Sequence, residues 1–107
     1  MNGFEDERLD DDRWWLATLG RTIVWARLRE RKAGTGEVFD SDGNTLSYDS
    51  VDTACAALMD ADFVAFDGLD DEDALERGFL LADVAPPSAD NDDALKPRMV
   101  QELGARA

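Results

Sequence analysis

The chain has 107 residues, of which 44% are hydrophobic, and its 25 acidic and 11 basic residues give a formal net charge of −14. This length supports one domain with a modest core, and the hydrophobic content excludes a wholly disordered protein. The sequence has no apolar run long enough to span a membrane and no histidine, which excludes a Ser-His or Cys-His catalytic pair.

The first twelve residues are acidic and polar, and we expect residues 1–12 to form a flexible segment. They lack the basic start and apolar middle of a secretory signal peptide, so the sequence predicts a cytoplasmic protein. Residues 13–19 fit either a helix that begins at Asp12 or a first strand that bends at Gly20-Arg21. The helix is the interpretation that we prefer there.

Residues 22–31 contain a run of strand-forming side chains and predict a strand, with one long helix from Asp12 as the alternative. One face of this strand carries Val24, Ala26 and Leu28. The opposite face carries Ile23, Trp25, Arg27, Arg29 and Arg31. We expect the strand to pair with residues 37–40 and to form a meander of at least three strands.

A hairpin is predicted around Asp42-Gly43, the dipeptide that a two-residue type I′ turn prefers. With that loop, Phe39 pairs with Leu46 and Val38 pairs with Ser47. Pairs of aromatic and aliphatic side chains across two strands stabilise a hairpin. We therefore expect the face with Phe39 and Leu46 to point inward.

A helix is predicted over residues 50–59, with Asp49 or Ser50 as its N-cap. Its apolar stripe consists of Val51, Ala54, Cys55, Leu58 and Met59. Residues 60–62 end this helix, and residues 63–66 predict a short buried strand before a turn at Gly68. The expected centre of the core consists of Phe39, Leu46, Leu58, Phe63 and Phe66.

Residues 70–77 predict a second helix, because acids favour its positive N-terminal end and Gly78 suits its C-terminal end. Residues 79–84 are apolar and are expected to cover the core or to add an edge strand. Residues 86–107 are expected to be a linker and a mobile C-terminal tail. A single globular domain is therefore predicted over residues 13–85.

Charge is divided unevenly along the chain. Residues 13–36 carry six bases and one acid, whereas residues 37–76 carry 13 acids and no base. Such a division bears on partners and solubility, not on the fold. Two interpretations stay open: acidic neighbours neutralise the basic strand, or the exposed acids of residues 60–76 bind a basic partner.

Residues 38–46, VFDSDGNTL, resemble the first motif of the haloacid dehalogenase superfamily, in which Asp-x-Asp-Gly follows an apolar strand. The resemblance implies a phosphoryl-transfer enzyme with Asp40 as nucleophile, Asp42 as acid or base, and Mg²⁺ beside both. Lys96-Pro97 is similar to a later motif of that family. The family also requires a parallel sheet with crossover helices, for which this chain is too short, and an acidic motif that does not follow Lys96 here. Phosphoryl transfer is therefore the last of our alternatives.

Metal and cofactor sites are not predicted. A calcium-binding EF-hand loop that starts at Asp40 would need glycine in place of Thr45 and glutamate in place of Val51. A chain without histidine and with one cysteine, Cys55, is not expected to bind zinc, and this cysteine is interpreted as a small buried hydrophobe. We expect no enzyme activity, no catalytic residue, no metal and no cofactor.

Residues 23–46, IVWARLRERKAGTGEVFDSDGNTL, resemble a part of the Sm-like small β-barrels: a long bent strand, a glycine turn and short strands. The resemblance implies a curled sheet, RNA binding and assembly into rings. RNA would then contact the face that carries Trp25, Arg27, Arg29 and Arg31. The net charge of −14 opposes binding to phosphates, so we do not favour a nucleic-acid partner.

The sequence thus predicts a small α+β protein, with one or two helices packed on an antiparallel sheet that either stays flat or curls into a partly open Sm-like barrel. The function we expect is a non-enzymatic protein-interaction module, an acidic decoy or inhibitor of a basic partner. Its partner-binding residues would be Asp70, Asp71, Glu72 and Asp73. A homo-oligomer built through sheet edges or through Trp14 and Trp15 is a further alternative, and no membrane contact is expected.

Overall fold

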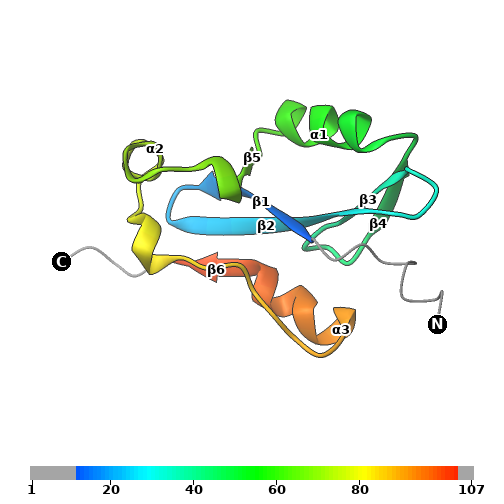
Figure 1. Ribbon diagram of the computed structural model, residues 1–107. Helices are drawn as coiled ribbons and strands as arrows, with labels where there is room; N and C mark the ends of the chain where they lie inside the picture. Colours follow the sequence, from blue (N-terminus) through cyan, green and yellow to red (C-terminus); the bar gives the residue numbers. More distant parts are fainter. Residues whose placement is uncertain (1–11, 104–107) are drawn as a thin grey trace, which may run out of the picture.

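A six-stranded antiparallel sheet lies at the centre of the structure, a computed structural model that describes residues 12–103 (Figure 1). Its strands are β1 (Arg13–Leu19), β2 (Thr22–Glu30), β3 (Gly36–Phe39), β4 (Thr45–Tyr48), β5 (Val64–Ala65) and β6 (Val100–Glu102). The helices are α1 (Val51–Asp60), α2 (Asp71–Glu76) and α3 (Asp92–Leu95), with 3₁₀ turns η2 (Phe66–Gly68), η3 (Leu81–Asp83) and η4 (Lys96–Met99). The predicted α+β fold is confirmed, and the sheet stays open and does not close into a barrel. The predicted flexible segment lies outside the described residues, except for Asp12.

β2 is the central strand, because both of its edges are paired. One edge pairs along its length with β1, from Leu28 opposite Arg13 to Thr22 opposite Leu19. The other edge is shared, since its C-terminal half pairs with β3 and its N-terminal half pairs with β6. The predicted strand at residues 22–31 and its pairing with the strand that follows are therefore confirmed.

Residues 13–19 form strand β1, so the helix that we preferred there is wrong and the alternative strand is right. A two-residue loop at Gly20-Arg21 joins β1 to β2, and Gly20 has a φ of 62°, which favours glycine. Trp15 and Leu16 are both buried although they point to opposite faces. A strand covered on both faces reads as a continuous apolar run, and this is why its period resembled that of a helix.

The hairpin of β3 and β4 exists, but its predicted register is wrong by one residue. Phe39 lies opposite Thr45 and Val38 lies opposite Leu46. The cause is the side chain of Asp40, whose Oδ1 accepts hydrogen bonds from the backbone N–H groups of residues 42 and 44, both at 3.0 Å. This arrangement favours a three-residue loop closed between residues 40 and 44, with Gly43 at a φ of 88°, over the two-residue loop.

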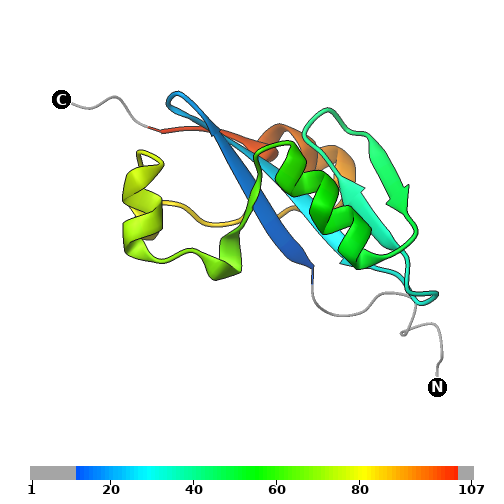
Figure 2. The same cartoon turned by 90° about the horizontal axis from the view of Figure 1, so that it is seen from above.

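Two separate cores lie on the two faces of the sheet. The core under α1 consists of Trp15, Ala26, Leu28, Val38, Ala54 and Leu58. The core on the other face consists of Leu16, Ile23, Trp25, Phe39, Ala74, Phe79, Val84, Leu95 and Met99. Figures 1 and 2 show α1 on one side of the sheet and the C-terminal segment with α3 on the other.

The predicted core centre is correct only in part. Phe39 and Leu58 are buried as predicted. Leu46 is 46% exposed, because it lies on the edge strand β4, where it pairs with Val38 and not with Phe39. Phe63 and Phe66 are only half-buried at the margins of the two cores. Strand β5 is correspondingly shorter than the predicted buried strand at residues 63–66.

α1 confirms the predicted helix at residues 50–59. Ser50 is the N-cap, and its Oγ accepts a hydrogen bond from the N–H of Thr53 at 3.1 Å. Ala54 packs so closely on β3 that a Cβ on Gly36 would lie 2.9 Å from its Cβ, so this position needs glycine. Met59 was predicted on the apolar stripe but is 59% exposed, because the buried face of α1 is centred on Ala54 and Leu58 and Met59, one residue after Leu58, lies at its side.

The C-terminal half wraps the second core. α2 confirms the predicted helix at residues 70–77, with Asp70 as N-cap and Gly78 at a φ of 95° after its end. The sequence predicted a linker and tail from residue 86 on. In the structure residues 86–103 pack on the sheet instead: Leu95 and Met99 are buried, and β6 pairs with β2. The apolar residues Met99, Val100 and Leu103 belong to the 3₁₀ turn η4, the strand β6 and the residue after it, and not to a helix.

Candidate interaction surfaces

The arginines of the predicted basic face form ion pairs with acidic residues of the same chain. Arg27 is only 6% exposed, and its guanidinium donates to the two carboxylate oxygens of Asp92 at 2.9 and 3.5 Å. It also lies 5.0 Å from the centre of the Phe39 ring. The hydrogen bond from Arg27 lowers the pKa of Asp92 below its ordinary value.

Three other arginines of this region are also paired. Arg29 donates to both carboxylate oxygens of Asp12 at 2.8 and 3.0 Å, and these hydrogen bonds raise the pKa of Arg29 above its ordinary value. The guanidinium of Arg31 lies 3.2 Å from the carboxylate of Glu37. Arg13 and Glu30 form a looser ion pair, with 4.0 Å between the two charged groups. This pattern agrees with the interpretation that acidic neighbours neutralise the basic strand, although none of these acids comes from residues 60–76.

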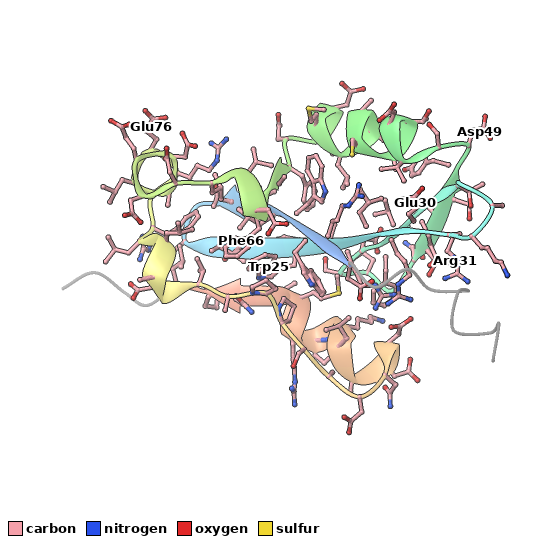
Figure 3. The ribbon with its side chains drawn as sticks, viewed as in Figure 1. Trp25, Glu30, Arg31, Asp49, Phe66 and Glu76 are labelled. Atoms are coloured by element: carbon pink, nitrogen blue, oxygen red, sulfur yellow. The ribbon has the colours of Figure 1, made fainter. Side chains whose placement is uncertain are left out.

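Trp25 is fully buried and contacts two other aromatic rings, of which that of Phe66 is labelled beside it in Figure 3. Its ring packs edge to face with Trp14 at a centroid distance of 6.0 Å and with Phe66 at 5.3 Å. Trp25, Arg27 and Arg29 do share one face of β2, as predicted, but the C-terminal segment covers that face. Stacking a base on Trp25 would require this segment to leave.

A hollow of about 400 Å³ opens beside these ion pairs. It is lined by Asp12, Trp14, Arg27, Arg29, residues 87–92 and Leu95. Both arginines in it are already paired, and the three carboxylates of Asp12, Asp90 and Asp92 outnumber them. The charge of the hollow therefore does not favour a phosphate group.

The predicted acidic residues belong to a larger set that we call the acidic layer. It consists of Asp49, Asp52, Asp60, Asp62, Asp67, Asp70, Asp71, Glu72, Asp73 and Glu76. All ten carboxylates are exposed except that of Asp73, which is half-buried. In Figure 3 the layer extends from Asp49 beside α1 to Glu76 on α2.

Within the part of the chain that the structure describes, no base forms an ion pair with the acidic layer. Among residues 12–103, the four ion pairs use the carboxylates of Asp12, Glu30, Glu37 and Asp92, and none belongs to the layer. Asp70 has a structural role, because its Oδ1 accepts the N–H of Asp73 at 2.8 Å and caps α2. Asp71 and Glu72 are exposed and have no such role.

The Asp-x-Asp-Gly motif holds a turn. Asp40 uses one carboxylate oxygen to bind the backbone of its own loop, and the strands around it are antiparallel, whereas the haloacid dehalogenase superfamily requires a parallel sheet. Within residues 12–103, no group of three or more acidic or cysteine side chains is placed to hold a metal ion. This placement offers no support for phosphoryl transfer.

Trp14 and Trp15, which we considered for self-association, pack inside the chain. Trp15 is 7% exposed in the core under α1, and Trp14 is half-buried against Trp25. No helix in the described part of the chain has the length and apolar character to cross a membrane.

A groove of about 430 Å³ lies over β1, between the end of α1 and the residue that follows α2. Figure 2 shows α1 and α2 on either side of β1. It is lined by Leu16, Ala17, Thr18, Met59, Asp62, Phe63, Val64 and Arg77. The sequence analysis missed this groove, because it arises where β5 begins only at Val64, opposite Leu16, while β1 continues to Leu19. The only sequence signal was the break at residues 60–62, which we interpreted as a helix end.

No protein-family model matches this chain, and neither do any curated protein or any solved structure. The resemblance to Sm-like barrels therefore stays a prediction about residues 23–46.

Proposed function

We propose that this protein is a non-enzymatic interaction module whose acidic layer binds a basic protein in the cytoplasm, as an acidic decoy or inhibitor does. One observation carries the proposal: the bases of β2 are paired within the chain, while the ten carboxylates of the acidic layer have no ion-pair partner among residues 12–103. Carboxylates that face solvent close together repel one another. Binding of a basic surface relieves this repulsion and is therefore favourable.

The first experiment is affinity capture of the tagged protein from the lysate of its own host, at low and high salt and with nuclease-treated controls. We expect a basic protein that is retained at low salt and released at high salt, because screening weakens attraction between exposed charges. Capture that disappears after nuclease treatment would favour the RNA-binding alternative. Capture of this chain alone would favour a homo-oligomer.

The second experiment reverses two exposed charges of the acidic layer that do not cap a helix. The double variant Asp71→Lys with Glu72→Lys should weaken binding of the captured partner about tenfold or more, because two attractions become repulsions. Asp70 is left unchanged, because it caps α2.

The matched control is the double variant Asp90→Lys with Asp93→Lys, which makes the same charge change at exposed positions outside the acidic layer. Its affinity should stay close to that of the original protein. An equal loss in the two double variants would show that net charge governs binding and would contradict a role for the acidic layer.

A further inference from the structure

The outer edge of β1 is only partly used by the chain. β5 pairs with Trp15 and Leu16, whereas β1 continues to Leu19. Hydrogen-bonded and non-hydrogen-bonded pairs alternate in an antiparallel ladder, and Leu19 opposite Thr22 closes a two-residue loop. The backbone N–H and C=O of Thr18 therefore point away from β2. No backbone hydrogen bond from residues 12–103 reaches them from β5 or the loop before it, so this edge can accept a further strand.

The loop before β5 does not pair with this edge, because its backbone bonds to the end of α1. Asp62 has a φ of 70°, and its N–H donates to the carbonyl of Met59 at 3.0 Å. The N–H of Phe63 donates to the carbonyl of Leu58 at 2.9 Å. The backbone before β5 is therefore closed onto the end of α1 and is not available to residues 17–19 of β1.

The open edge is the floor of the groove between α1 and α2. Met59, Asp62 and Phe63 form the wall on the α1 side, and Arg77 forms the wall on the α2 side. Met59 in the lining is 59% exposed, and Leu19, the last residue of β1 and next to Thr18 of the lining, is 68% exposed. An occupant with apolar side chains would bury surface that the chain itself leaves in water.

The charges around the groove favour a cationic occupant. α1 and α2 both end here, and the carbonyl ends of helices carry partial negative charge. The last turns of the two helices contain no basic side chain, and Asp60, Asp62 and Glu76 add carboxylates at these ends. Arg77 is the single base in the lining and does not balance them.

We propose that an extended segment of the basic partner, with alternating basic and apolar residues, adds to the sheet along residues 17–19 of β1. Its backbone would bond to Thr18, its apolar side chains would contact Met59 and Phe63, and its basic side chains would meet the acidic ends of α1 and α2. This inference rests on the proposed function and specifies how the partner is bound. A second copy of this chain is a poor occupant, because its own acidic surface would face these carboxylates.

The probe is a short fluorescent peptide of alternating lysine and valine, compared with oligolysine of equal charge and with a glutamate–valine peptide. Fluorescence anisotropy at low salt should show that the lysine–valine peptide binds at least about tenfold more tightly than oligolysine. The glutamate–valine peptide should not bind. In amide NMR spectra of the labelled protein, the largest shifts on peptide addition should come from Thr18, Leu19 and Met59.

Thr18→Pro removes the outward N–H without touching the ladder to β2, and it should weaken the lysine–valine peptide about tenfold. Ser47→Pro is the matched control. Its N–H also points outward by register, but from the other open edge of the sheet at β4, so binding should not change. Met59→Lys supplies a second test at an exposed position and should weaken the same peptide about tenfold by repulsion.

The outcomes separate this inference from the proposed function. Equal binding of the two basic peptides, with no effect of Thr18→Pro or Met59→Lys, would overturn strand addition and leave the acidic layer as a general binding surface. No binding of either basic peptide would overturn both. Self-association that Thr18→Pro abolishes, seen by light scattering, would replace the basic partner with a second copy of this chain.

Discussion

β2 and the acidic layer carry opposite charges and use them in different ways. The two arginines of β2, Arg27 and Arg29, lie in or beside a core, and each is paired with a carboxylate from elsewhere in the chain. The carboxylates of the acidic layer stand in solvent, and within residues 12–103 none takes part in an ion pair. The first group of charges is needed by the fold. In the second group, only the N-cap Asp70 and the acids in the first turns of α1 and α2 stabilise it.

The physical reason for this difference is burial. A guanidinium in a core must be paired, because an unpaired buried charge costs several kcal/mol. A carboxylate in water has no such requirement, and repulsion within a cluster makes it slightly unfavourable for folding. Charge on the covered strand of this chain is therefore part of its fold, whereas the exposed charge on its helices is what the proposed function uses.

The largest expected effect on stability comes from replacing Trp25, the side chain on which RNA bases would stack in the RNA-binding alternative. Trp25→Ala should lower the free energy of unfolding by about 3–5 kcal/mol, because it removes a fully buried aromatic ring from between Trp14 and Phe66. Urea denaturation followed by circular dichroism measures this change. Trp25→Phe is the control and should cost about 1–2 kcal/mol, since the indole Nε1 has no hydrogen-bond partner to lose.

One result would contradict the view that the face of β2 belongs to the core. In it, Trp25→Ala leaves the free energy of unfolding unchanged within about 0.5 kcal/mol and abolishes oligonucleotide binding. In that case the C-terminal segment would be a removable cover, and the face of β2 would be a binding surface and not a core.

The next effect tests the pairing on β2 from both sides. Asp92→Ala should lower the free energy of unfolding by about 1–2 kcal/mol, because it leaves the buried Arg27 without its partner; the half-exposed Asp92 keeps the loss below that of a fully buried pair. Arg27→Met should change stability by less than about 1 kcal/mol, because the apolar side chain keeps the packing on Phe39 and removes a buried Nε that has no partner. Equal losses in the two variants would mean that the pair itself, and not the burial of one charge, is what matters.

The sequence predicted the parts of the fold that rest on local patterns. The strand at residues 22–31, the helix from Ser50 and the helix capped by Asp70 follow from alternation, capping residues and terminal glycines. The errors came from tertiary context. β1 looked helical because both its faces are covered, and the hairpin slipped by one residue because the Asp40 carboxylate binds two backbone amides.

The candidate sites divide in the same way. Residues 70–73 could be identified as an exposed acidic start of a helix, because they are consecutive in the sequence. The pairing of Arg27 with Asp92 joins residues 65 positions apart, and the groove over β1 joins three separate elements. Neither has a local signature, so neither could be predicted without the topology of the sheet.

A smaller effect concerns pH. The hydrogen bond from Arg27 holds the pKa of Asp92 below its ordinary value of 3.8 in the folded protein, so this pair contributes stability that is fully present above that pH and is lost as pH falls through the folded pKa. Urea midpoints measured from about pH 6 down to about pH 3 should therefore fall more steeply in the original protein than in Asp92→Asn. Parallel curves for the two proteins would contradict a role for this pair in acid unfolding.

The smallest expected change in the free energy of unfolding concerns the acidic layer. Its sign, and not its size, is the test. Asp60 is exposed at the carbonyl end of α1, so Asp60→Lys should raise the free energy of unfolding by about 0.5 kcal/mol through the helix dipole and reduced repulsion. Asp52→Lys makes the same charge change in the first turn of α1 and should lower it by a similar amount. Both variants should nevertheless bind the basic partner more weakly. A carboxylate that costs stability and supports binding is maintained for the partner, whereas a loss of stability in Asp60→Lys would show that this residue serves the fold.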